Sequence, residues 1–116
     1  MSSAGLQPLD ELRFYRVLGT TPGVALVFFT AVGCSSCRAW KRLLQDYVRE
    51  HHDIRVFEID AQISMGLARE YEVFHLPALF LFVDGEFHCA LHCEARPGAL
   101  RAAIDAAMAA PAQEAP

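Results

Sequence analysis

The segment TAVGCSSCRAW, residues 30–40, contains the pair of residues in this chain whose types and spacing point most clearly to chemical reactivity. Two serines separate Cys34 from Cys37, so one turn of helix would bring both sulfurs to the same side. Two thiols at this spacing exchange disulfides, provide half of a zinc site, or pack as inert thiols in a small core. The elements around the pair bear on which of these three alternatives holds.

An apolar strand and an amphipathic helix are predicted on either side of the pair. Residues 24–29, VALVFF, form a continuous apolar run typical of a strand buried on both faces of a parallel sheet. After the pair, apolar residues repeat at helical spacing and predict one buried face. These residues are Trp40, Leu43, Leu44, Tyr47 and Val48.

At this junction Cys34 would occupy the N-terminal end of the helix, where free N–H groups and the helix dipole stabilise a thiolate. A lowered pKa would make Cys34 the nucleophile. Cys37, one turn further on, would be less exposed and close enough to attack a mixed disulfide at Cys34. A redox pair is therefore the favoured interpretation, while a zinc half-site and a chance pair of buried thiols stay open.

The other elements alternate along the chain. Residues 9–18 predict a first helix, with Leu9, Leu12 and Leu18 near helical spacing, and GTTPG at residues 19–23 ends it. The pattern then predicts a strand at residues 54–59 and a helix carrying Ile63, Leu67 and Tyr71. A hairpin follows, in which Asp84-Gly85 joins residues 79–83 to residues 86–92. A last helix begins at Pro97 and carries Leu100, Ile104 and Met108.

Alternation along the second hairpin strand predicts two faces. One face would carry Phe87, Cys89, Leu91 and Cys93, and the other His88, Ala90 and His92. Cys89 is most simply a small buried hydrophobe.

Together these elements predict an α/β fold: a mixed sheet of four to five strands flanked by helices, in the order β-α-β-α-β-β-α after an extra N-terminal helix. We expect one domain at residues 9–109, a flexible segment at 1–8 and a disordered, Ala- and Pro-rich tail at 110–116.

Composition excludes several classes of protein. The formal net charge is −4 and the ten Lys and Arg residues form no stripe, which argues against a nucleic-acid partner. The sequence shows neither a secretory signal pattern nor an apolar run of about 18 residues that would span a membrane. We therefore expect a soluble, cytoplasmic protein, in which four cysteines indicate redox or metal chemistry rather than a disulfide framework.

Three segments in succession resemble the thioredoxin family: VALVFFTAVGCSSC, then FEID, then VFHLPALFLFVDGE. The resemblance covers residues 24–108 and implies a thioredoxin fold and thiol-disulfide exchange, without a cofactor or a bound metal. It implies Cys34 as the attacking cysteine and Cys37 as the resolving one. It also implies a cis peptide bond at Pro77, facing the pair, with the backbone of Leu76 pairing with the substrate chain.

Departures from the family pattern fall near the pair. Gly33 replaces a tryptophan, and Ser35-Ser36 replace Gly-Pro, which predicts a less rigid loop and a different recognition surface. The family's buried acid maps onto Phe28 and its lysine partner onto Val56, so Cys37 must lose its proton to solvent or to another base.

Two further departures concern the fold. Arg42 replaces the proline that kinks the active-site helix. Too few residues precede Leu9 for the family's first strand to be assured. We therefore expect a thioredoxin-like protein rather than a general-purpose thioredoxin.

Cys93 falls where thioredoxins have a glycine beside the cis-proline, so it is a candidate third thiol in the substrate groove. The same neighbourhood offers two alternatives of other classes. Cys34, Cys37, Cys93 and His75 could form a Cys₃His zinc site, or the fold could hold a peptide without turnover.

Our overall prediction is a monomeric disulfide oxidoreductase that acts on a protein or small thiol substrate and receives electrons from a donor such as a reductase. The predicted substrate-binding residues are Gly33, Ser35, Ser36, Leu76, Pro77 and Cys93.

Overall fold

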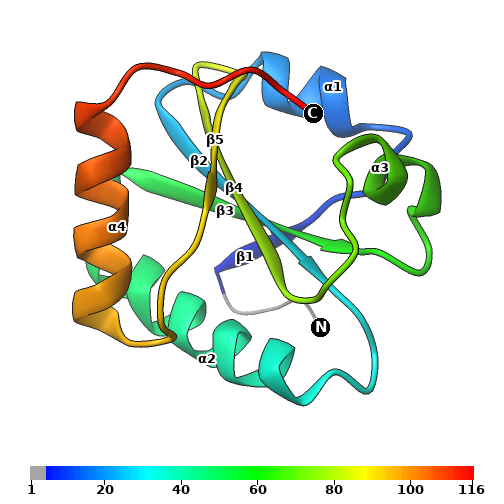
Figure 1. Ribbon diagram of the computed structural model, residues 1–116, viewed down its shortest axis with the longest axis horizontal. Helices are drawn as coiled ribbons and strands as arrows, with labels where there is room; N and C mark the ends of the chain where they lie inside the picture. Colours follow the sequence, from blue (N-terminus) through cyan, green and yellow to red (C-terminus); the bar gives the residue numbers. More distant parts are fainter. Residues whose placement is uncertain (1–4) are drawn as a thin grey trace.

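Five strands form one mixed sheet in the computed structural model, which describes residues 5–116 (Figure 1). The strand order is β1-β3-β2-β4-β5. The strands β1, β3 and β2 run parallel to one another, β4 runs antiparallel to β2, and β5 runs antiparallel to β4. The elements are β1 (Leu6–Pro8), α1 (Phe14–Gly19), β2 (Val24–Thr30), α2 (Ser35–Glu50), β3 (Ile54–Asp60), α3 (Met65–Glu70), β4 (Ala78–Val83), β5 (Glu86–Leu91) and α4 (Pro97–Ala109). The predicted α/β architecture is confirmed.

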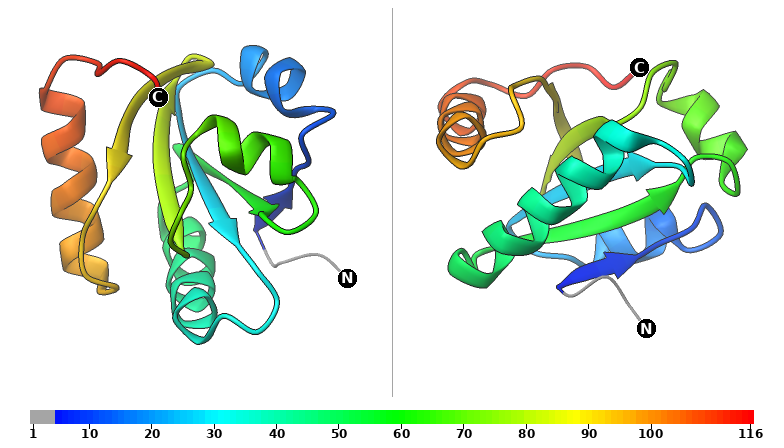
Figure 2. Two further views of the ribbon diagram at one scale, coloured as in Figure 1. Left: turned by 45° about the vertical axis from the view of Figure 1, so that its right-hand side comes forward. Right: turned by 90° about the horizontal axis from the view of Figure 1, so that it is seen from below.

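Helices cover both faces of the sheet. α2 and α4 pack on one face, and α1 and α3 on the other (Figure 2). The central strand β2 is buried on both sides because its side chains alternate between these two layers, which explains the unbroken apolar run at residues 24–29. We call the layer under α2 and α4 the α2/α4 cluster; its members include Leu26, Phe28, Cys37, Leu44, Val56, Leu81 and Leu100.

The amino-terminal segment contains a strand that was not assured from the sequence. Leu6–Pro8 pair in parallel with β3, and Leu6 is only 2% exposed, because its side chain joins the α2/α4 cluster. Part of the segment that we expected to be flexible therefore has a defined place in the sheet. Residues 1–4 of that segment lie outside the described residues.

The first helix is shorter than its sequence pattern predicted. Leu9 continues the pairing of β1 by donating its N–H to the Glu58 carbonyl, and Asp10 then closes a turn by accepting the N–H of Arg13 at 3.1 Å. The helix begins only at Phe14, so Leu12 is left 90% exposed instead of facing the core.

The burial predicted for the apolar side chains of α2 is confirmed, whereas that predicted for the helix around α3 is confirmed only in part. Trp40, Leu43, Leu44 and Tyr47 are buried as predicted. Ile63 is 76% exposed, because α3 begins only at Met65 and the preceding loop turns outward.

A β-bulge in β5 changes the predicted faces of that strand. Leu81 pairs with Cys89 and Phe82 with Phe87, so His88 is an extra residue without a partner in β4. Phe87 therefore packs with the α1/α3 layer, while Cys89 packs under α4 in the α2/α4 cluster. Strict alternation had wrongly placed Phe87 and Cys89 on one face.

Residues 110–116 form neither helix nor strand and are exposed. One hydrogen bond ties them to the sheet edge, since the Gln113 N–H donates to the His88 carbonyl at 2.7 Å. Among residues 5–116, no helix is both long and apolar enough to cross a membrane.

Candidate active site

Cys34 and Cys37 lie at the junction between β2 and α2. Cys34 is the N-cap residue of the helix, and Cys37 lies in its first turn. The two form a disulfide with a Cα–Cα distance of 5.2 Å. The Sγ atom of Cys34 also accepts the backbone N–H of Cys37 at 3.2 Å, and the Oγ atom of Ser36 lies 3.5 Å from the same sulfur. The predicted junction is confirmed.

The two sulfurs differ in their surroundings. Cys37 is 2% exposed and belongs to the α2/α4 cluster, whereas Cys34 is partly exposed at its edge. Because Cys34 caps the helix terminus, where backbone N–H groups and the positive dipole end favour negative charge, a thiolate formed on reduction would be better stabilised at Cys34 than at Cys37. The accessible cysteine is thus also the one suited to attack.

The other predicted site residues lie in two places: on the loop and first helical turn around Cys34, and at the cis-proline and the segment after β5. Gly33, Ser35 and Ser36 are exposed on the loop and first helical turn around Cys34, and Gly33 has a φ of +88°. The peptide bond between Leu76 and Pro77 is cis. Leu76, Cys93 and Cys34 all pack against the α2/α4 cluster.

The thiols of β5 and the segment that follows it remain free of disulfides. Burial raises the pKa of Cys89, which is 7% exposed, as expected for a small core residue. Burial, and secondly the charge of Glu94, raise the pKa of Cys93. Both thiols therefore stay protonated at neutral pH, so Cys93 is a poor nucleophile in its resting state.

The metal alternative has no geometric support. Among the residues that the structure describes, no three His, Cys, Asp or Glu side chains come together in a way that could hold a metal ion. His75 is exposed, and the Cys₃His set considered from the sequence does not assemble.

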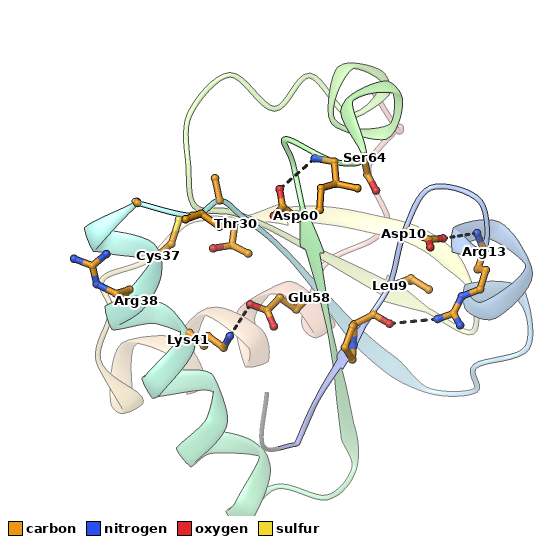
Figure 3. Close-up of a pocket in the computed structure, with 15 residues that line it drawn as sticks. Leu9, Asp10, Arg13, Thr30, Cys37, Arg38, Lys41, Glu58, Asp60 and Ser64 are labelled. Atoms are coloured by element: carbon orange, nitrogen blue, oxygen red, sulfur yellow. Dashed lines mark hydrogen bonds and ion pairs between the residues drawn. The ribbon is translucent and has the colours of Figure 1, made fainter. Parts of the chain in front are cut away.

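A cavity of about 830 Å³ opens beside Cys37 (Figure 3). Cys37 lines this cavity, whereas Cys34 and Pro77 do not. Its walls come from residues 8–13, 30–33, 37–41 and 58–64.

Two charged residues in this cavity were not singled out from the sequence. Lys41 of α2 and Glu58 of β3 point toward each other, and Nζ lies 3.2 Å from Oε2 (Figure 3). Glu58 interrupts the otherwise apolar end of a buried strand, VFEI, and that interruption was a usable signal. Its partner could not be named, because the pairing depends on how α2 lies across β3.

Phe28 and Val56, the positions onto which the family's acid and lysine map, lie in the same apolar cluster as Cys37. Phe28 is fully buried and Val56 is 1% exposed. Neither side chain is able to exchange a proton.

Comparisons with known proteins agree with this geometry. The family model described as "Thioredoxin" matches residues 6–106. Thioredoxin Asp f 28 of Aspergillus fumigatus is 26% identical over 86 residues, covering 74% of this chain and 79% of that protein. A thioredoxin of Mycolicibacterium smegmatis is 29% identical over 86 residues, covering 72% and 76% respectively.

The fold is also similar to a solved structure. The crystal structure of oxidized mitochondrial thioredoxin 3 from Saccharomyces cerevisiae superposes with a TM-score of 0.75 at 26% identity. The match covers 90% of this chain and 99% of that one.

Proposed function

The chain belongs to the thioredoxin family and is a thiol-disulfide oxidoreductase with the pair Cys34–Cys37, and from that premise we propose that it reduces disulfides in protein substrates. The observation that carries the proposal is the asymmetry of the pair. Cys34 caps α2 at the surface, while Cys37 is 2% exposed behind it. This arrangement supports Cys34 as the attacking cysteine and Cys37 as the resolving one.

The proposed reaction has two steps. The Cys34 thiolate attacks one sulfur of the substrate disulfide, which forms a Cys34–substrate disulfide and releases the other substrate sulfur as a thiolate. The Cys37 thiolate then attacks Cys34, so that the Cys34–Cys37 disulfide forms and the second substrate thiolate leaves. The substrate gains two electrons and the pair loses two.

The surface around Cys34 supports a protein substrate. Gly33, Ser35 and Ser36 would contact it from one side, and Leu76, Pro77 and Cys93 would line the groove on the other. Two large apolar side chains are exposed in the loops that carry these residues: Val32 is 84% exposed and Phe74 is 78% exposed. Exposed apolar side chains beside a reactive group favour contact with a protein partner.

We also propose a cytoplasmic setting. Cys89 and Cys93 remain free thiols in a chain of four cysteines, which is consistent with a reducing compartment. A reductase as electron donor and a monomeric state stay predictions.

A trapping experiment with insulin, whose disulfides are intact, tests the proposed function. C37S stops the reaction after the first step, so it should accumulate a mixed disulfide with an insulin chain, visible on a non-reducing gel. The double variant C34S/C37S is the matched control and should form none. Wild-type protein should speed the reduction of insulin by dithiothreitol. No acceleration and no trapped species would contradict the proposal.

A further inference from the structure

A carboxylate lies on the α2/α4 face of the sheet and lines the same cavity as the resolving cysteine. Glu58 pairs in register with Phe28, so the two side chains point to the same face. Phe28 is fully buried in the α2/α4 cluster, and the Glu58 side chain is only 13% exposed. Glu58 is therefore a charged group at the edge of an apolar layer.

Lys41 links this carboxylate to the active-site helix. It follows Cys37 by four residues, so both side chains lie on one side of α2. Lys41 is 38% exposed along its side chain, and its Nζ contacts Glu58 at 3.2 Å. Cys37, Lys41 and Glu58 all line the same cavity.

The resolving step requires Cys37 to lose a proton, because the thiolate is the attacking form. Cys37 is 2% exposed, and the core beside it contains Phe28 and Val56, which accept no proton. The cavity is a route to Cys37 for water, since its volume of about 830 Å³ accommodates several molecules and charged side chains form part of its mainly apolar lining.

The remaining ionisable groups of the cavity fit this role less well. Arginine side chains have no acceptor atom. Asp10 and Asp60 are held within their own loops, where Asp10 accepts the backbone N–H of Arg13 and Asp60 accepts those of Gln62 and Ile63. The charged groups that line the cavity are Asp10, Arg13, Arg38, Lys41, Glu58 and Asp60. Among them, Glu58 is the carboxylate paired with the active-site helix.

We propose that Glu58, oriented by Lys41, accepts the proton of the Cys37 thiol through water in this cavity during the second step of disulfide exchange. As the Cys37 sulfur bonds to Cys34, the bond between Cys34 and the substrate breaks. The proton passes from Cys37 to Glu58 and from there to solvent, and the departing substrate thiolate takes up a proton of its own. Glu58 thus acts on Cys37 through water as its proton acceptor, and Lys41 is the positioning residue. The inference rests on the proposed two-step exchange and concerns only its second step.

Dithionitrobenzoate separates the two steps. Attack by Cys34 on this small aromatic disulfide releases one coloured thionitrobenzoate, and resolution by Cys37 releases the other, so stopped-flow absorbance records two phases ahead of the slower reaction of the free thiol Cys93. General base assistance typically contributes at least a hundredfold, and water in the open cavity partly replaces it. We expect E58Q to slow the second phase about tenfold at pH 7 and to leave the first phase within about twofold.

Two further measurements separate proton transfer from a structural effect. Added imidazole, a small base, should restore the second phase of E58Q in proportion to its concentration, and E58D, which keeps a carboxylate, should retain most of the rate. D46N removes the carboxylate of an exposed ion pair with Arg49 on the same helix and should change neither phase.

An unchanged second phase in E58Q would overturn the inference, as would equal slowing of both phases without rescue by imidazole. If E58Q does not fold, the absence of a second phase in E58D, as in C37S, would overturn it equally. A different result would contradict the proposed function and not the role of Glu58: wild-type protein that reduces dithionitrobenzoate in two phases but does not reduce insulin.

Discussion

The sulfur of Cys34 lies 3.2 Å from the backbone nitrogen of Cys37 and accepts its N–H. A cysteine here occupies the place that an oxygen-bearing side chain usually takes at a helix N-cap. The contact satisfies one of the free N–H groups of α2 and directs its dipole at Cys34 rather than at Cys37. The chemical difference between the two cysteines thus follows from their positions at the end of one helix.

Graded alkylation should expose this difference. In the reduced protein, we expect iodoacetamide to modify Cys34 well before Cys37, with a pKa for Cys34 below that of an ordinary thiol, because the helix end stabilises its thiolate. Peptide mass spectrometry at a series of pH values measures both rates. Equal rates, or faster labelling of Cys37, would contradict the assignment.

Cys93 should behave in the opposite way. Burial and the nearby charge of Glu94 raise its pKa, so the thiolate is scarce at neutral pH and becomes abundant only above the usual thiol range. We expect Cys93 to label more slowly than Cys34 at pH 7 and to gain rate as the pH rises. C93S should still reduce insulin. Labelling of Cys93 as fast as Cys34 would instead support its role as a third reactive thiol.

Two glycines with positive φ should differ in their tolerance of alanine. Gly85 has a φ of +85°, and a Cβ atom there would lie 2.6 Å from the Leu18 carbonyl oxygen. Gly33 has a φ of +88° but no atom within 4 Å of such a Cβ. We expect G33A to lower the free energy of unfolding by about 1 kcal/mol, from backbone strain alone.

The clash should make G85A the more damaging change, with a loss of about 3 kcal/mol in urea denaturation. G33A is its matched control, because it carries the same backbone strain without the clash. Equal losses in the two variants would show that the approach of Leu18 to the hairpin turn is not close in solution.

Two leucines test the packing of the helices. Leu44 is fully buried under α2, whereas Leu12 is 90% exposed in the turn before α1. L44A should lower the free energy of unfolding by about 3 kcal/mol, because it leaves a cavity in the core. L12A should change it by less than about 0.5 kcal/mol. A large loss in L12A would mean that the first helix extends to Leu12, as its sequence pattern had predicted.

Much of the site was predictable because its signals are local. An apolar run before the cysteines and a helical repeat after them place Cys34 at a strand-to-helix junction, whatever the rest of the chain does. The strand patterns predicted a mixed sheet, and the resemblance in VFHLPALFLFVDGE added the cis bond before Pro77; the structure confirms both. The zinc alternative drew on the same residues and did not assemble among those described.

The errors occurred where local periodicity is not the deciding force. Leu12 has helical spacing, but the chain there continues its pairing with β3 and then turns through Asp10. Phe87 follows the alternation of its strand, but the bulge at His88 reverses its direction. Pairing with β3 overrides the local pattern in the first place, and the irregular pairing of β5 with β4 overrides it in the second.

The sequence by itself favoured redox chemistry for the cysteine pair and determined the order of the elements from α1 onward, because both depend on residues close together in the chain. Only the tertiary structure decided which groups surround Cys37. The register of β3 against β2 sets Glu58 beside Phe28, and the lie of α2 across the sheet brings Lys41 to Glu58. These contacts join residues that are far apart in sequence, and the packing of the whole domain determines them.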